Sequence, residues 1–317
     1  MRRYRRFGDF VDKAISFIEE RRLGYNSSLK TSLPKLDAVL LDGIPPNRIL
    51  TIAGMSGSGK SIFSDQLIDD FVKNDQRVKV LSIELEMAGT DIALRQLSAN
   101  TGIDSGLMLS SNKRKLSAED YAKVIETGKI LSEREIYIVD EPVSVSSVEE
   151  VIRDFMVDTD FYNDDYFLVV KIDYVSLLDK DKVTDNELSI VTALYKILVN
   201  IKKEISNKGK RVLFVCLSQL NRDIESTERL KPENQHPLAK DLFAASAVQF
   251  GSDYVVIIHN PSKLNLVSFG VKREPVKNEE GLPIIYIFIK KNRFGREGYF
   301  PAIGDFAKGK IAQLQCS

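Results

Sequence analysis

The chain carries a glycine-rich run that ends in a lysine and a serine, and these residue types at this spacing can hold phosphate groups. In this run, residues 54–61, four residues separate two glycines, and Lys60 and Ser61 follow the second. Glycines let successive backbone N–H groups face the α- and β-phosphates, Lys60 reaches the β- and γ-phosphates, and the Ser61 hydroxyl can ligate Mg²⁺. The run therefore predicts that ATP and Mg²⁺ are bound, with the nucleotide held by Gly54, Ser56, Gly57, Ser58, Gly59, Lys60 and Ser61.

The sequence on both sides of this run supplies the elements that must position it. The apolar residues 49–53 come directly before it and predict a strand. Phe63, Leu67 and Phe71 follow at helical spacing, so a helix should begin at the loop. The N-terminal dipole of that helix would then face the phosphates. Strand, loop and helix together make the phosphate-binding interpretation specific.

Acidic residues at two further strand ends are candidates for the metal and for the attacking water. Asp173 ends the largely apolar strand 167–173, where its carboxylate can hold the Mg²⁺ shell or can cap the next turn. Glu84 and Glu86 follow the strand 78–83, at an edge where open α/β sheets bind ligands. Either glutamate could orient or deprotonate a water, and either could be a solvated loop charge.

Polar and basic residues after two later strands suggest how hydrolysis is sensed and triggered. Gln219 ends the apolar strand 212–217 and could contact the γ-phosphate or its water, although glutamine at a strand end is common. Lys291 and Arg293 follow the strand 284–290. A basic cluster there is either a solvated turn or an arginine finger, which offers its guanidinium to the phosphates of an adjacent subunit. The second interpretation requires an oligomer.

From residue 49 onward, apolar runs alternate with helical patterns, which predicts an α/β fold with a mostly parallel central sheet and helices on both faces. The predicted strands are 49–53, 78–83, 136–140, 167–173, 212–217, 254–259 and 284–290, and the predicted helices are 61–73, 90–100, 118–131, 147–155 and 187–206. Before them, residues 7–18 repeat apolar side chains on one face of a helix, and residues 24–34 indicate a loop or hinge. This helix either folds back on its own domain or crosses to a neighbouring subunit. The predicted division is residues 1–34, an N-terminal arm with a linker helix and hinge, and residues 35–317, the ATPase domain.

Composition narrows the class of protein. Of 317 residues, 43% are apolar, which is enough for a sizeable core. The 45 basic and 45 acidic side chains balance, so no global field draws the chain to nucleic acid or to an anionic membrane, and any contact with a polyanion must be local. Cys216 and Cys316 lack the spacing of metal ligands, which favours a reducing compartment. No apolar stretch is long enough to span a bilayer, so we expect a cytoplasmic protein without a membrane partner.

The order and spacing of these segments resemble the C-terminal motor domain of DnaB-type replicative DNA helicases, which have a RecA-like P-loop NTPase core. The resemblance rests on Leu85-Glu86-Met87, Ile172-Asp173-Tyr174, Ser218-Gln219-Leu220-Asn221-Arg222 and Lys291-Asn292-Arg293. It implies that Glu86 rather than Glu84 is the catalytic glutamate and that Asp173 binds the metal. It also implies that Gln219 is a sensor, that Lys291 and Arg293 act in trans, and that the first helix is a linker packing on the neighbouring subunit.

Two departures from the family pattern limit what the resemblance implies. Only a short arm precedes the linker-like helix, so the sequence resembles a compact version without the N-terminal collar domain that meets primase. Residues 237–246 resemble the loop that faces single-stranded DNA, but Phe243 and Ala244 replace its usual Arg-Glu pair. Lys240 could still meet a phosphate, and Phe243 could stack on a base or pack in the core.

The sequence therefore predicts a ring-forming, ATP-hydrolysing DNA helicase of replication, acting as a homo-oligomer, with a hexameric ring as the family form, in a bacterial or viral replication context. Single-stranded DNA is the expected partner, and a primase or helicase loader is a further one. The alternatives are a RecA-like regulatory or scaffolding ATPase and a recombination mediator, neither of which would unwind duplex DNA.

Overall fold

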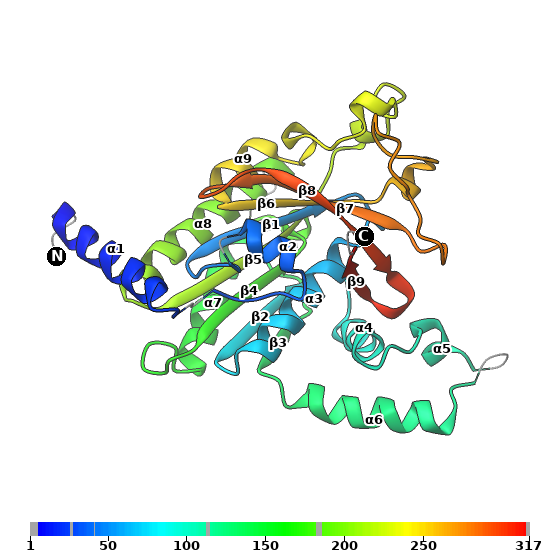
Figure 1. The fold of residues 1–317 in the computed structure, drawn as a ribbon. Helices are drawn as coiled ribbons and strands as arrows, with labels where there is room; N and C mark the ends of the chain where they lie inside the picture. The colour runs from blue at the N-terminus through cyan, green and yellow to red at the C-terminus, as the bar shows by residue number, and fades with distance from the viewer. Residues whose placement is uncertain (1–5, 26–27, 41, 112–114, 182–185, 315–317) are drawn as a thin grey trace.

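The structure is a computed structural model that describes residues 6–25, 28–40, 42–111, 115–181 and 186–314. Helices and strands alternate along most of the chain (Figure 1). The helices are α1 (Phe7–Arg22), α2 (Pro34–Val39), α3 (Lys60–Asn74), α4 (Gly89–Thr101), α5 (Ser105–Leu109), α6 (Ala118–Ser132), α7 (Val145–Asp158), α8 (Glu187–Asn207) and α9 (Ala245–Gly251). The strands are β1 (Arg48–Gly54), β2 (Val78–Glu84), β3 (Ile136–Val139), β4 (Phe167–Asp173), β5 (Arg211–Gln219), β6 (Tyr254–His259), β7 (Ile284–Asn292), β8 (Gly298–Asp305) and β9 (Lys310–Gln313).

The strands form one sheet in the order β3-β2-β4-β5-β1-β6-β7-β8-β9. Every pair from β3 to β6 is parallel, and the pairs from β6 to β9 are antiparallel. Strands β4 and β6 are buried along their whole length, as expected for parallel strands covered on both faces. The predicted α/β fold with a mostly parallel sheet is confirmed.

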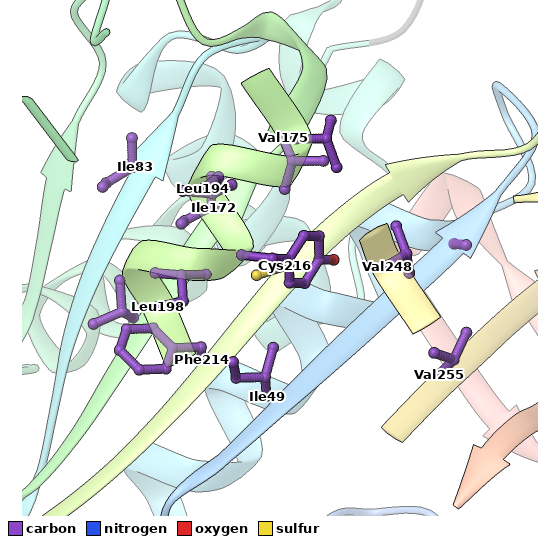
Figure 2. Close-up of a cluster of buried hydrophobic side chains, with 14 of the residues drawn as sticks. Ile49, Ile83, Ile172, Val175, Leu194, Leu198, Phe214, Cys216, Val248 and Val255 are labelled. Carbon is purple, nitrogen blue, oxygen red and sulfur yellow. The ribbon is translucent and has the colours of Figure 1, made fainter. Parts of the chain in front are cut away.

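Helices cover the sheet on two faces, each with its own apolar core. One core joins α7, α8 and α9 to side chains such as Ile49, Ile172 and Phe214. Figure 2 shows Cys216 of β5 in this core, between Leu194 of α8 and Val248 of α9. The other core joins α2 and α3 to the opposite sides of the same strands. Because successive side chains of a strand face opposite sides, an unbroken apolar run serves both cores at once.

Several elements were not predicted from the sequence. Strands β8 and β9 extend the sheet beyond β7, and α2, α5 and α9 are short helices of five to seven residues. Pro301 and three glycines in or beside these two strands hide them from a strand pattern. Part of the expected hinge also belongs to the domain, because Leu29 and Leu33 are buried in the second core. Cys216 is a buried free thiol, and Cys316 lies outside the described residues.

Helix α1 projects from the body of the molecule (Figure 1), and none of its residues is buried. Its apolar side chains are exposed to a degree unusual for their type: Phe7 81%, Ile18 64% and Ile15 59%. Of the two arrangements left open by the sequence, folding back on its own domain is not what this structure shows. In the part of the chain that the structure describes, no helix is long and apolar enough to cross a membrane.

Candidate nucleotide site

The glycine-rich run lies between the end of β1 and the start of α3, as its strand and helix patterns predicted. Gly59 precedes Lys60 with a φ of 97°, a backbone region that favours glycine, and a β-carbon there would stand 2.7 Å from the Phe306 ring. A β-carbon on Gly54 would stand 2.3 Å from Ser58 Oγ and 2.8 Å from the Ile258 carbonyl oxygen. The loop therefore needs both glycines in order to close, and it opens directly onto the N-terminus of a helix, where anions bind.

The predicted site residues of three other strands meet this loop at one edge of the sheet. Gly54 pairs in register with Gln219 of β5, and Glu84 of β2 pairs with Asp173 of β4. Since β2, β4, β5 and β1 are consecutive parallel neighbours, their C-terminal ends line up beside one another. We call these four strand ends, with the glycine-rich loop, the phosphate edge. Lys60, Ser61, Asp173, Glu86 and Gln219 all belong to it.

Asp173 is suited to hold a divalent cation. Its side chain is 3% exposed, and its Oδ1 atom is buried without a hydrogen-bond partner in the described residues. Burial raises the pKa of Asp173 above its ordinary value, against the opposing effect of the Lys171 ammonium. A buried carboxylate oxygen without a partner is costly, and an oxygen-seeking ion such as Mg²⁺ would satisfy it. Asp173 and the nearby Ser61 hydroxyl therefore fit a Mg²⁺ ion that a bound nucleotide would share.

The two candidate glutamates differ sharply in environment. Glu84 is buried, and its Oε1 atom accepts hydrogen bonds from Lys171 Nζ, at 2.7 Å, and from the Ser82 hydroxyl. Glu86 lies two residues further along and is exposed. Glu84 is thus held inside the protein, whereas Glu86 is free to meet a water. This contrast agrees with the choice of Glu86, whose catalytic role remains a prediction.

Lys171 is a residue of this edge that the sequence analysis did not assign. Its ammonium lies 2.7 Å from Asp65 Oδ1, 2.7 Å from Glu84 Oε1 and 4.0 Å from Asp173 Oδ2, with its side chain only 2% exposed. Burial opposes its charge, yet these three carboxylates outweigh burial and raise the pKa of Lys171. A lysine inside an otherwise apolar strand was the available signal. Its partners come from other elements, which the strand pattern does not reveal.

The loop that resembles a DNA-facing segment is tied to Gln219 through the backbone. The Phe243 N–H donates to the Gln219 carbonyl at 2.9 Å, and the Asn221 N–H donates to the Asp241 carbonyl at 2.6 Å. Arg229 clamps the loop by donating from both terminal nitrogens to the Asp241 carboxylate, at 2.6 and 2.8 Å. Lys240 is exposed. Phe243 is half-buried against the first core, so packing is the use that the structure shows, and base stacking stays a prediction.

Lys291 and Arg293 lie at the other end of the sheet, which we call the basic edge. Asn292 pairs with Tyr254, and Tyr254 pairs with Leu50, four residues before Gly54. At about 3.3 Å per residue and about 4.8 Å per strand, this places them roughly 13 Å along and about 10 Å across the sheet from the loop of the same chain. Arg293 Nη1 instead lies 2.9 Å from Asp253 Oδ1, and Lys291 donates to the Gln249 carbonyl. The structure does not bring these two residues to their own phosphate loop.

Comparisons with known proteins agree with this fold. Residues 28–303 match the family described as DnaB-like helicase C-terminal domain. The solved ATPase domain of a DnaB-like helicase superposes with a TM-score of 0.78 at 20% identity, covering 96% of this chain and 99% of that one. A DnaB-like replicative helicase, described with its interactions with primase, superposes with a TM-score of 0.77 at 20% identity, covering 96% of this chain and 66% of that one.

Two archaeal proteins are more distant. A KaiC-like protein of Pyrococcus horikoshii superposes with a TM-score of 0.53 at 15% identity, covering 91% of this chain and 99% of that one. A UPF0273 protein of Pyrococcus furiosus is 30% identical over 125 residues, which is 39% of this chain. The match spans 47% of the length of that curated relative. These similarities at low identity support the fold of the chain.

Proposed function

The chain belongs to the family of DnaB-like helicase C-terminal domains, and from this premise we propose that it is a ring-forming motor that hydrolyses ATP to translocate on single-stranded DNA and to unwind duplex during replication. One observation carries the proposal: Lys60, Asp173 and Gln219 gather at the phosphate edge, whereas Lys291 and Arg293 lie at the basic edge. A basic edge that cannot reach its own loop can serve the loop of a neighbouring copy. A closed ring, hexameric as in this family, would repeat that contact at every interface.

In this ring each site would combine two subunits. One subunit would hold the phosphates with its glycine-rich loop and Lys60, share Mg²⁺ between Ser61 and Asp173, orient the water with Glu86, and sense the γ-phosphate with Gln219. The neighbour would supply Lys291 and Arg293, whose positive charge stabilises the transition state. Helix α1, within the arm of residues 1–34, would cover its exposed apolar face on an adjacent motor domain of residues 35–317.

Coupling to DNA would run through the loop that hangs from β5. Because Gln219 and the adjacent Asn221 are bonded to the backbone of residues 241–243, a shift of Gln219 on hydrolysis would move Lys240. Lys240 is exposed and suited to contact a DNA phosphate. A similar replicative helicase is described with its interactions with primase, so a primase or a helicase loader is the proposed protein partner here.

The second candidate is a RecA-like regulatory or scaffolding ATPase, or a recombination mediator, that does not unwind DNA. The superposition with a KaiC-like protein, the balanced net charge and the packing of Phe243 into the core support this alternative. Each of these features concerns the DNA side of the function. The nucleotide site would be the same in both cases.

The test is ATP hydrolysis with and without single-stranded DNA, on protein whose assembly state has been determined by mass. A helicase should be stimulated severalfold by DNA and should separate a forked duplex, and Lys60→Ala should abolish both activities. DNA-independent hydrolysis without strand separation would favour the scaffold. DNA-stimulated hydrolysis without strand separation would favour the mediator. Full hydrolysis by Lys60→Ala would refute the nucleotide site itself.

A further inference from the structure

Lys263 lies at the phosphate loop, although it is distant from that loop in the sequence and was not assigned any role. Its Cε and Nζ atoms stand 3.1 and 3.2 Å from the point where a β-carbon on Gly57 would lie. Gly57 is exposed and has a φ of 70°, a conformation that L side chains rarely adopt. The ammonium group of Lys263 is therefore at the rim of the loop that is shaped to hold phosphates.

A short turn fixes the backbone of Lys263 beside the loop. The turn, Pro261–Leu264, follows β6 directly. The Ser262 N–H donates to Asn260 Oδ1 at 3.1 Å, the Lys263 N–H donates to the Asn260 carbonyl at 3.1 Å, and Ser262 Oγ donates to the Val276 carbonyl at 2.9 Å. Strand β6 is the direct neighbour of β1, with Ile258 paired to Gly54. The lysine thus extends from a rigid strand end that belongs to the same edge.

The Lys263 ammonium has no ion pair and no hydrogen bond within the described residues, unlike two better-buried lysines of this protein. Lys171 has two carboxylate oxygens at 2.7 Å, and Lys202 has Asp253 Oδ2 at 2.6 Å. An unpaired cation beside a polyanion site gains free energy when the polyanion binds, and no protein carboxylate has to be displaced first. Lysine is a compact charge on a flexible stem, a form well suited to non-bridging phosphate oxygens.

We propose that Lys263 binds the polyphosphate chain of the nucleotide from within the same subunit, as a second lysine beside Lys60. The inference rests on the proposed function insofar as it assumes that the glycine-rich loop binds ATP. Since the added attraction scales with the charge of the ligand, Lys263 favours a triphosphate over a diphosphate and a diphosphate over a monophosphate. It thereby sets how strongly the site discriminates ATP from its product before any neighbouring subunit contributes.

The experiment is a calorimetric titration of the full chain with ATP, ADP and AMP in the presence of Mg²⁺ at low salt. For Lys263→Ala we expect the affinity to fall about tenfold for ATP, about threefold for ADP and less than about twofold for AMP. Lys263→Arg keeps the charge and should remain within about threefold of the unaltered protein for ATP. Lys272→Ala removes another exposed lysine of the same segment and should change none of the three affinities.

Two different failures are distinguishable. If Lys263→Ala binds all three nucleotides as the unaltered chain does, while Lys60→Ala loses ATP binding, the nucleotide site stands and the role of Lys263 is refuted. If the unaltered chain binds no ATP at all, the proposed function fails and this inference fails with it. A loss of affinity equal for ATP, ADP and AMP would also overturn it, because a charge contact must depend on the number of phosphates.

Discussion

The phosphate edge and the basic edge of the same sheet differ in how far one chain completes them. At the phosphate edge, Lys60 is 5% exposed and Asp173 is 2% exposed, so their positions are imposed by packing around them. At the basic edge, the Arg293 side chain is 49% exposed, and the nearby helix α1 buries none of its residues. One fold therefore suffices to build a nucleotide-binding site, whereas the residues expected to trigger turnover await a second surface.

Arg293→Ala is the sharpest way to break this contrast. If Arg293 acts in trans, turnover should fall about 10³-fold while ATP affinity changes less than about twofold, because an arginine finger stabilises the transition state and contributes little to ground-state binding. Phosphate release and nucleotide binding, measured on the same preparation, check both halves of the prediction. Arg296→Ala, in the same exposed turn, should leave turnover unchanged.

Mixing variants separates a finger acting in trans from one acting within its own chain. A ring assembled from Arg293→Ala and Lys60→Ala subunits contains interfaces where an intact loop meets an intact arginine. Such mixed rings should recover part of the hydrolysis that neither variant shows alone. If no mixing ratio restores hydrolysis, the division of the site between two copies is not supported.

Lys171→Met tests how much the phosphate edge depends on its buried charges. The substitution leaves Asp65 and Glu84 buried without their cation, and removing one partner of a buried ion pair typically costs about 3–5 kcal/mol. We expect a loss of about that size in the free energy of unfolding by urea. Lys202→Met at the basic edge is the matched comparison, and it should cost less because Asp253 retains Arg293 and the Ile49 N–H. Equal losses at the two edges would contradict the contrast drawn above.

Acid should affect the phosphate side more than the basic edge, through His259 at the end of β6. Burial lowers the pKa of His259 to about 3, and neither ring nitrogen has a hydrogen-bond partner within the described residues. The unfolded chain takes up a proton near pH 6.5 and the folded chain does not, so stability falls as the pH drops below that value. At pH 5 the cost is about 2 kcal/mol, at about 1.4 kcal/mol per pH unit.

The pH dependence is measured by urea unfolding at pH 7 and at pH 5. Replacing the histidine in His259→Phe should remove most of the difference that this residue causes, while the contribution of the carboxylates remains in both proteins. His236→Phe is the comparison on a histidine that is less buried, and its effect should be smaller. An unchanged pH dependence in His259→Phe would show that the ring is not held neutral by burial.

Ile18→Asp should have the smallest effect on the single chain and a visible one on assembly. Ile18 is 64% exposed, so the free energy of unfolding of the isolated subunit should change by less than about 0.5 kcal/mol. If α1 packs on a neighbour, a buried aspartate would weaken association by about tenfold or more. Mass measurements across a concentration series check this. Ser16→Asp, on the opposite face of the helix, should leave the assembly state unchanged.

The sequence analysis found the strands and the long helices that carry the site, because each has a strong local period. It placed Asp173 and Gln219 correctly at strand ends, since an apolar run followed by a polar residue is itself a local signal. It did not find β8 and β9, where glycine and proline break the pattern and pairing to β7 compensates. It left Glu84 and Glu86 open from the residues alone, because the buried lysine that occupies Glu84 comes from another strand.

What the sequence by itself determined is local: a glycine-rich loop between a strand and a helix, and apolar runs long enough to form a parallel sheet buried on both faces. These follow from backbone freedom at glycine and from the periods of strands and helices, which neighbouring residues encode. Only the tertiary structure decided that Lys171 lies among three carboxylates, that Lys263 reaches the rim of the phosphate loop, and that Arg293 faces away from it. The order and direction of the strands set these distances, and residues close along the chain do not encode that order.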